Sequence, residues 1–187
     1  MPTNRALVAL TASLNLAACA TAPEAPTPPT EEREAYLGVA AQPLGEHRFV
    51  GAQPDAEDFA ELKTAGITKV INFRTPPEMD ELGFDEPQIL ADLGIEYVHI
   101  PMGGDEYGYT AAQVDALASA LSDPDEKVLL HCTIGWRASM VTVAYLVREE
   151  GVPLDEAMTH AQRWWPLQLE KMLGRPLKLE FAEDDAP

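Results

Sequence analysis

The sequence predicts an α/β domain with a central, mostly parallel sheet and helices on both faces. Short apolar runs alternate with segments that have helix start and stop signals, a pattern typical of a parallel sheet covered on both sides. Residues 128–130 are wholly apolar, as in a strand that is buried on both faces. Residues 140–147 are almost all apolar without a polar face, which indicates a helix surrounded by protein.

The predicted elements follow one another with short connections. Strands are expected at residues 49–50, 70–73, 95–100 and 128–130. Helices are expected at residues 55–65, 87–93, 110–121 and 140–147, and from residue 153 onward. For the first helix, Asp55 is the expected N-cap and Gly66 the stop. The carboxyl ends of the parallel strands should lie at one edge, where ligand sites form.

Residues 1–18 have the pattern of a signal peptide. Arg5 supplies a positive charge, and the apolar stretch after it is too short to span a bilayer. The Leu-Ala-Ala-Cys that ends at Cys19 resembles a bacterial lipobox, and this resemblance implies cleavage before Cys19 and lipidation of that residue. By the sorting rule for lipoproteins, Ala20 favours the outer over the inner membrane. We therefore expect a lipid-anchored, periplasm-facing protein of the bacterial cell envelope, with a plain signal peptide as the alternative.

The remaining chain divides into three segments. Residues 19–45 are rich in Pro, Thr and Ala and are predicted to form an extended tether. Residues 46–175 are long enough for one domain with its own core, and residues 176–187 form an acidic tail. The formal net charge of −18 argues against nucleic acid as a partner, because nucleic-acid phosphates would meet a repulsive field.

The chain has two cysteines. If Cys19 carries lipid, Cys132 has no intramolecular partner in a compartment that favours disulfides, which indicates a reactive thiol. No metal site is predicted, because the spacing of His47, His99 and His160 along the chain does not match that of metal ligands.

Cys132 and Arg137 enclose a short loop between the central strand and the central helix. Backbone N–H groups at such a strand–loop–helix junction point at one place, which attracts anions. A thiolate at Cys132 would be stabilised there and would act as a nucleophile. The guanidinium of Arg137 matches phosphate or sulfate oxygens. The residues predicted to line this anion site are His131, Thr133, Ile134, Gly135 and Trp136, with Gly135 allowing the tight turn.

The segment HCTIGWR resembles the Cys loop of the cysteine-dependent protein-tyrosine and dual-specificity phosphatase superfamily. That superfamily usually places five residues between Cys and Arg, whereas four stand here. The pattern CxxGxR is similar to the bacterial phosphatase-like domains named after beta-lactamase hydrolase-like proteins, and also to the six-residue loop of rhodaneses. GAQPDAEDF and TKVINFR resemble the opening of the former domains, and AYLVREEGVPLDEA resembles dual-specificity phosphatases.

The resemblance implies a protein-tyrosine-phosphatase-like fold and hydrolysis of phosphomonoesters without a cofactor. Cys132 would attack phosphorus to form a phosphocysteine, while Arg137 and loop amides hold the oxygens. In relatives the residue equivalent to His131 helps to hold the Cys; a satisfied buried histidine is the alternative. Ala138 stands where relatives carry Ser or Thr, and Ser139 follows it. The substrate would be a phosphoprotein or a small phosphoester.

A general acid is expected on the glycine-containing loop 101–108, which precedes the Cys strand by one helix. Asp105 is the first candidate and Glu106 the second, the alternative being that both only solvate the loop. Arg74 is expected to be either a second anion contact or part of a surface ion pair.

Two other functions fit the same loop. A rhodanese-like sulfurtransferase would carry a persulfide on Cys132 and need no acid. It should also return to the sheet with a strand after the central helix, where the sequence predicts a helix at residue 153. A catalytically weak anion-binding module is the third possibility, favoured by Ala138.

Overall fold

The computed structural model describes residues 41–161 and 166–178. In these two ranges the strands form one five-stranded sheet with the order β1-β2-β5-β3-β4, in which only β1 is antiparallel to its neighbour. The strands are β1 (Ala41–Leu44), β2 (Arg48–Gly51), β3 (Lys69–Asn72), β4 (Glu96–His99) and β5 (Val128–His131). The prediction of a mostly parallel sheet is confirmed.

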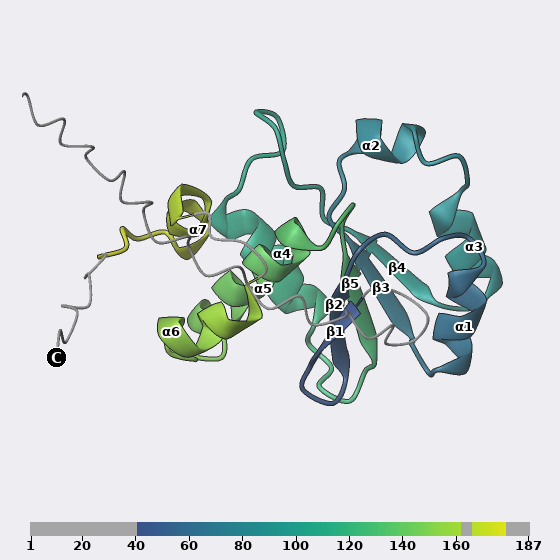
Figure 1. Ribbon diagram of the computed structural model, residues 1–187, viewed down its shortest axis with the longest axis horizontal. Coiled ribbons are helices and arrows are strands. Elements are labelled where there is room, and N and C mark those ends of the chain that lie inside the picture. The colour runs from purple at the N-terminus through teal and green to yellow at the C-terminus, as the bar shows by residue number, and fades with distance from the viewer. Residues whose placement is uncertain (1–40, 162–165, 179–187) are drawn as a thin grey trace, which may run out of the picture. The chain divides into compact units, whose positions relative to one another are not determined.

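The helices connect and cover these strands (Figure 1). They are α1 (Asp58–Thr64), α2 (Pro76–Asp80), α3 (Glu86–Asp92), α4 (Ala111–Ala120), α5 (Trp136–Arg148), α6 (Leu154–Ala157) and α7 (Pro166–Leu173), with a 3-10 turn at Met158–His160. No described helix is both long and apolar enough to cross a membrane.

The sheet separates two hydrophobic cores because successive strand residues point to opposite faces. Leu129 of β5 packs with α1 and α3, whereas its neighbours Val128 and Leu130 pack with α4, α5 and α7. Figure 1 shows α1 and α3 on one side of the sheet and α4 to α7 on the other. Helices on both faces were predicted, and this prediction is confirmed.

β5 and α5 occupy the centre of the domain. β5 lies between β2 and β3, with His131 in register with Gly51 on one side and Asn72 on the other. All four β5 residues are buried, and residues 138–146 of α5 are buried without interruption. The end of β5 is therefore held by packing on every side, which makes it a rigid base for the residues that follow.

The structure differs from the sequence-based expectations in three places. β1 lies inside the predicted tether 19–45. Ala41–Leu44 form this strand because their backbone pairs with the outer edge of β2, and such pairing does not depend on the composition that suggested a tether. The helix α2 was not predicted. The N-cap of α1 is Glu57 and not Asp55, since the Asp55 carbonyl accepts from the Asp58 amide in the turn before the helix. The predicted signal peptide, residues 19–40 of the tether, residues 162–165 and residues 179–187 of the tail lie outside the described residues.

Candidate active site

The Cys loop runs from the end of β5 to the start of α5. Cys132 follows His131, and Gly135 is the N-cap of α5 with a φ of 89°. This left-handed conformation strains any residue with a Cβ, so glycine is required at the turn. The predicted strand–loop–helix junction is present, with the first-turn amides of α5 beside the carboxyl end of the central strand.

Arg137 faces the interior and not the solvent. Its side chain is 13% exposed and Cys132 is 1% exposed. Burial alone would lower the pKa of Arg137, but the hydrogen bonds to Glu78 and the negative charge of Cys132 raise it above the ordinary value. The two residues predicted to form the anion site therefore interact directly.

The guanidinium of Arg137 is held by protein acceptors at both of its Nη atoms. Its Nη1 and Nη2 donate to the two carboxylate oxygens of Glu78 at 2.7 and 2.6 Å. Nη1 also donates to the carbonyl of Met102 at 2.8 Å and lies 3.4 Å from that of Phe73. Nη2 donates to the hydroxyl of Thr133 at 3.0 Å. These five contacts join the ends of β3 and β4, α2 and the Cys loop at one side chain.

Glu78 is a site residue that sequence reasoning missed. Besides Arg137, its carboxylate accepts from the Thr75 amide and hydroxyl, both at 2.8 Å, and from the Thr133 hydroxyl at 2.9 Å. The Arg137 hydrogen bond, with help from Thr75, holds the pKa of Glu78 well below its usual range although burial opposes this. Thr75-x-x-Glu78 is a capping box that marks the start of α2. This motif was the sequence signal that could have placed Glu78 at a helix start near the site.

Arg74 meets neither expectation. It is 8% exposed and donates to the side-chain oxygen of Gln53 at 2.8 Å and to the carbonyl of Glu78 at 2.6 Å. It is thus neither an anion contact nor part of a surface ion pair. Arg74 binds the backbone of α2 at Glu78, the residue whose carboxylate holds Arg137.

His131 is fully buried and its Nε2 lies 3.0 Å from a carboxylate oxygen of Glu86. Glu86 is also fully buried, at the start of α3. His131 is not among the residues that line the cavity beside Arg137 described below, so its place in the anion site stays a prediction. Its other ring nitrogen, Nδ1, is buried without a hydrogen-bond partner.

A cavity of about 600 Å³ opens beside Arg137. Its lining includes Glu78 of α2, Tyr109, and Asp105 and Glu106 of the loop between β4 and α4. Both acid candidates thus share a cavity with Arg137. The loop also packs closely on the guanidinium, since a Cβ at Gly103 would lie 3.3 Å from Nη1 of Arg137. The lining contains Arg137 but not the thiol of Cys132.

The other predicted loop residues differ in exposure. Thr133 and Ile134 are exposed, and Ile134 is 44% exposed. Trp136 is half-buried, and Ser139 is buried with its hydroxyl donating to the Trp136 carbonyl at 3.0 Å. The side chain of Ile134 therefore lies at the surface of the loop.

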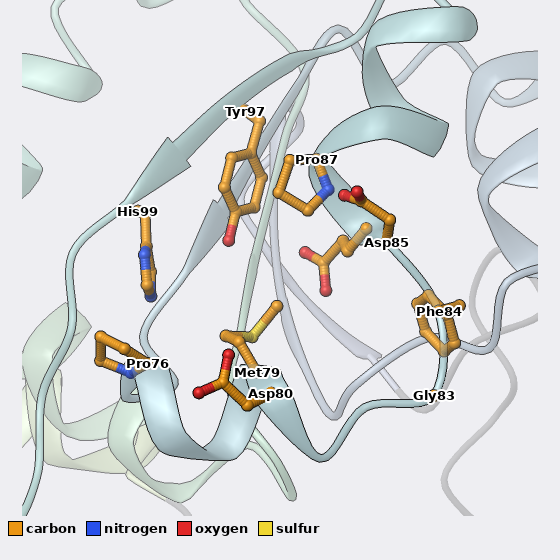
Figure 2. A pocket seen from close by; sticks show the side chains of 10 residues that line it. Pro76, Met79, Asp80, Gly83, Phe84, Asp85, Pro87, Tyr97 and His99 are labelled. Carbon is orange, nitrogen blue, oxygen red and sulfur yellow. The ribbon is translucent and has the colours of Figure 1, made fainter.

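A second cavity of about 600 Å³ is lined by residues of α2, of the segment that leads into α3, and of β4 (Figure 2). Met79, Phe84 and Tyr97 surround it, and the buried Glu86 contributes to its wall. Neither Cys132 nor Arg137 lines it. Of these two cavities, the one beside Arg137 is therefore the candidate site. Within residues 41–161 and 166–178, no group of three or more His, Cys, Asp or Glu side chains is placed to hold a metal ion.

The fold and the Cys loop define a class of protein, an α/β domain that presents a cysteine and an arginine at the carboxyl end of its central strand. Residues 42–145 match the family described as the phosphatase-like domain of the beta-lactamase hydrolase-like protein, and the chain belongs to this family. The match covers more than half of the chain.

Individual proteins agree with this assignment. The chain is 29% identical to the beta-lactamase hydrolase-like protein of Xylella fastidiosa over 63% of its length and 28% of that protein. It is 31% identical to dual specificity protein phosphatase 26 of Bos taurus over 59% of its length and 52% of that protein. It therefore spans about half or less of these relatives. A crystal structure of a provisionally designated phosphatase (DUF442) from Shewanella putrefaciens CN-32 is 26% identical with a TM-score of 0.60, covering 73% of this chain and 91% of that one.

Replacement of Glu78 by Ala is expected to weaken the binding of vanadate about tenfold. Arg137 would lose its two charge-assisted hydrogen bonds to the Glu78 carboxylate and would no longer be held in place. Isothermal titration would measure this change. Glu81→Gln, an exposed carboxylate at the end of the same helix, is the control and should bind as the wild type does. Tighter vanadate binding by Glu78→Ala would instead show that this carboxylate competes with the anion.

Proposed function

We propose that the chain is a cysteine-dependent phosphatase that hydrolyses phosphomonoesters. The observation that carries this proposal is the inward-facing guanidinium of Arg137 beside the buried Cys132, at the N-terminus of the central helix. A buried guanidinium next to a thiol favours the thiolate and provides donors for a phosphate. Membership of a phosphatase-like family supports the same chemistry.

The reaction would proceed in two steps through a phosphocysteine. The Cys132 thiolate attacks phosphorus, an S–P bond forms, and the ester P–O bond breaks as Asp105 gives its proton to the leaving oxygen. Asp105 then takes a proton from water, whose oxygen attacks phosphorus and releases Cys132. Arg137 and the loop amides would hold the non-bridging oxygens in both steps, so the mechanism needs no cofactor.

The substrate would be a phosphorylated protein or a small phosphoester. Tyr107, Tyr109 and Pro77 line the cavity beside Arg137, which supports an aryl or other flat group next to the phosphate. Asp105 and Glu106 line the same cavity, and their charges disfavour substrates with further phosphates.

A sulfurtransferase remains a second candidate because of the six-residue Cys loop. The chain after α5 does not support it, since α6 follows at Leu154–Ala157 where a rhodanese would return to the sheet with a strand. A weak anion-binding module is the third candidate. Ala138 favours it, because relatives carry a hydroxyl at this position. Glu78 favours it as well, because its carboxylate already accepts hydrogen bonds from both Nη atoms of Arg137.

The first prediction for this proposal concerns Cys132. The wild type should release phosphate from an aryl phosphate, and Cys132→Ser should lose at least about a thousandfold in rate because no thiolate remains to attack phosphorus. The same two proteins would be assayed for thiocyanate formed from thiosulfate and cyanide, where no turnover is expected. Thiosulfate turnover without phosphate release would establish the sulfurtransferase, and vanadate binding without either activity would establish the anion-binding module.

The second prediction concerns the acid. Asp105→Asn should lower kcat for an aryl phosphate about a hundredfold and remove the basic limb of the pH profile, because no group then protonates the leaving oxygen. Glu106→Gln, on the same loop, should change kcat less than about threefold. If Asp105→Asn keeps the rate and the pH profile of the wild type, Asp105 has no part in the mechanism. A loss in Glu106→Gln alone would transfer the role to Glu106.

We also propose that the protein is anchored to the bacterial envelope through lipid on Cys19 and faces the periplasm, with the outer membrane favoured over the inner one by Ala20. The support is the signal-peptide pattern of residues 1–18 and the lipobox resemblance that ends at Cys19.

Labelled palmitate should enter the protein in bacterial cells and be lost in Cys19→Ser, since no other residue of the lipobox offers a thiol. Cys132→Ser is the matched control and should keep the label. Label that persists in Cys19→Ser would contradict the anchor, and so would a wild type that takes up no label.

A further inference from the structure

The loop that carries both acid candidates forms a wall between two cavities. Residues 105–107 line the cavity beside Arg137, and they also line a cavity of about 560 Å³ that reaches Gln113 of α4. Figure 1 shows the loop between β4 and α4 projecting beyond the sheet. Asp105 and Glu106 are exposed, so side-chain packing does little to hold this part of the loop in place.

Glycines with a left-handed backbone stand on both sides of residues 105–107. Gly103 and Gly104 precede them with φ of 137° and 64°, and Gly108 follows them with φ of 39°. The backbone can therefore turn at either end of this segment. Met102, before the glycines, is fixed, because its amide and its carbonyl both take part in hydrogen bonds.

The other end of the loop is held by the side chain of Gln113. Its Nε2 donates to the carbonyl of Tyr107 at 2.8 Å, while its Oε1 accepts from the amide of Thr110 at 3.0 Å and from the Thr110 hydroxyl. These partners fix the orientation of the amide, since a backbone N–H only donates and a carbonyl only accepts. Among the residues that the structure describes, no other hydrogen bond joins residues 103–108 to another element.

A glutamine at position 113 combines two tasks that a glutamate could not. Thr110-x-x-Gln113 is a capping box at the start of α4, and Glu serves in such a box as well as Gln. An ionised carboxylate has no hydrogen to donate, so it could not hold the Tyr107 carbonyl. The cap therefore explains an acceptor at position 113, and the contact with the loop explains why that acceptor belongs to an amide.

We propose that Gln113 is a positioning residue that fixes the loop at Tyr107 and thereby holds Asp105 where it can protonate the leaving oxygen. The inference rests on the proposed function, in which Asp105 is the acid. The cavities on both sides leave the loop room to move, so this one bond decides where the carboxyl group stands. α4 thus assists proton transfer although none of its residues lines the cavity beside Arg137.

The test compares two substrates with different needs for an acid, using the full chain. Phenyl phosphate releases a basic phenolate that needs a proton, whereas the leaving group of 2,4-dinitrophenyl phosphate departs without one. Gln113→Glu keeps the cap of α4 but loses the donor. Its kcat/KM, which reports the step that breaks the ester bond, should fall about tenfold for phenyl phosphate and less than about twofold for 2,4-dinitrophenyl phosphate. Gln42→Glu, the same exchange at an exposed position of β1, should match the wild type with both substrates.

Two further variants separate this role from an effect of charge or of folding. Gln113→Met removes the donor without adding charge and should show the same difference between the two substrates. In the Asp105→Asn background, Gln113→Glu should lower kcat/KM for phenyl phosphate by less than about twofold, because the acid that it positions is already absent. An equal loss with both substrates, no loss with either, or an undiminished loss in the Asp105→Asn background would overturn the inference.

A measurement without catalysis tests the contact itself. The peptide bond between Tyr107 and Gly108, which chymotrypsin can cut, contains the carbonyl that Gln113 holds. Cleavage there, followed by mass spectrometry, should be about fivefold faster in Gln113→Glu than in the wild type or Gln42→Glu. Unchanged cleavage would contradict the inference. Failure of the proposed function is seen separately, as phosphate release that does not depend on Cys132, and it leaves the cleavage result standing.

Discussion

The two-point ion pair between Arg137 and Glu78 is the interaction on which the arrangement of the site depends. It joins the first turn of the central helix to α2, and the same guanidinium donates to the carbonyl of Met102 in the loop between β4 and α4. Because a guanidinium is planar, fixing one edge by two bonds also fixes the direction of the other edge. The position of the arginine relative to Cys132 therefore follows from a contact that lies outside the Cys loop.

The support for this pair comes from a layer of buried polar side chains beneath the loop. Arg74 holds the carbonyl of Glu78 and the side chain of Gln53, and Gln53 in turn donates to Glu86. Gln53 and Arg74 follow the carboxyl ends of β2 and β3, on either side of β5, and Glu86 lies at the start of α3. Each is satisfied mainly by another member, so the loss of one would leave its partners buried without bonds. Such a network favours a single geometry of the site over a set of similar ones.

The parallel sheet explains why these residues meet. In this topology the carboxyl ends of β2, β5, β3 and β4 lie at one edge, and the loops that leave them converge although they are far apart in sequence. Figure 1 shows α2 and the loop between β4 and α4 at the same end of the sheet. The long helix α5 starts there too, which adds the partial positive charge of its N-terminus to the site.

The sequence by itself determined β2 to β5, the helices on both faces apart from α2, the Cys loop and the need for Gly135, because each depends on apolar periodicity or on local backbone geometry. It did not reveal β1, whose place in the sheet depends on pairing with β2, nor the roles of Glu78, Arg74 and Glu86. Glu78 meets Arg137 across 59 residues and Glu86 meets His131 across 45. The capping box of Glu78 marks the start of α2 but not the partner of its carboxylate, because charge pairing depends on which loops the sheet brings together. Only the tertiary structure could decide which carboxylate faces which cation.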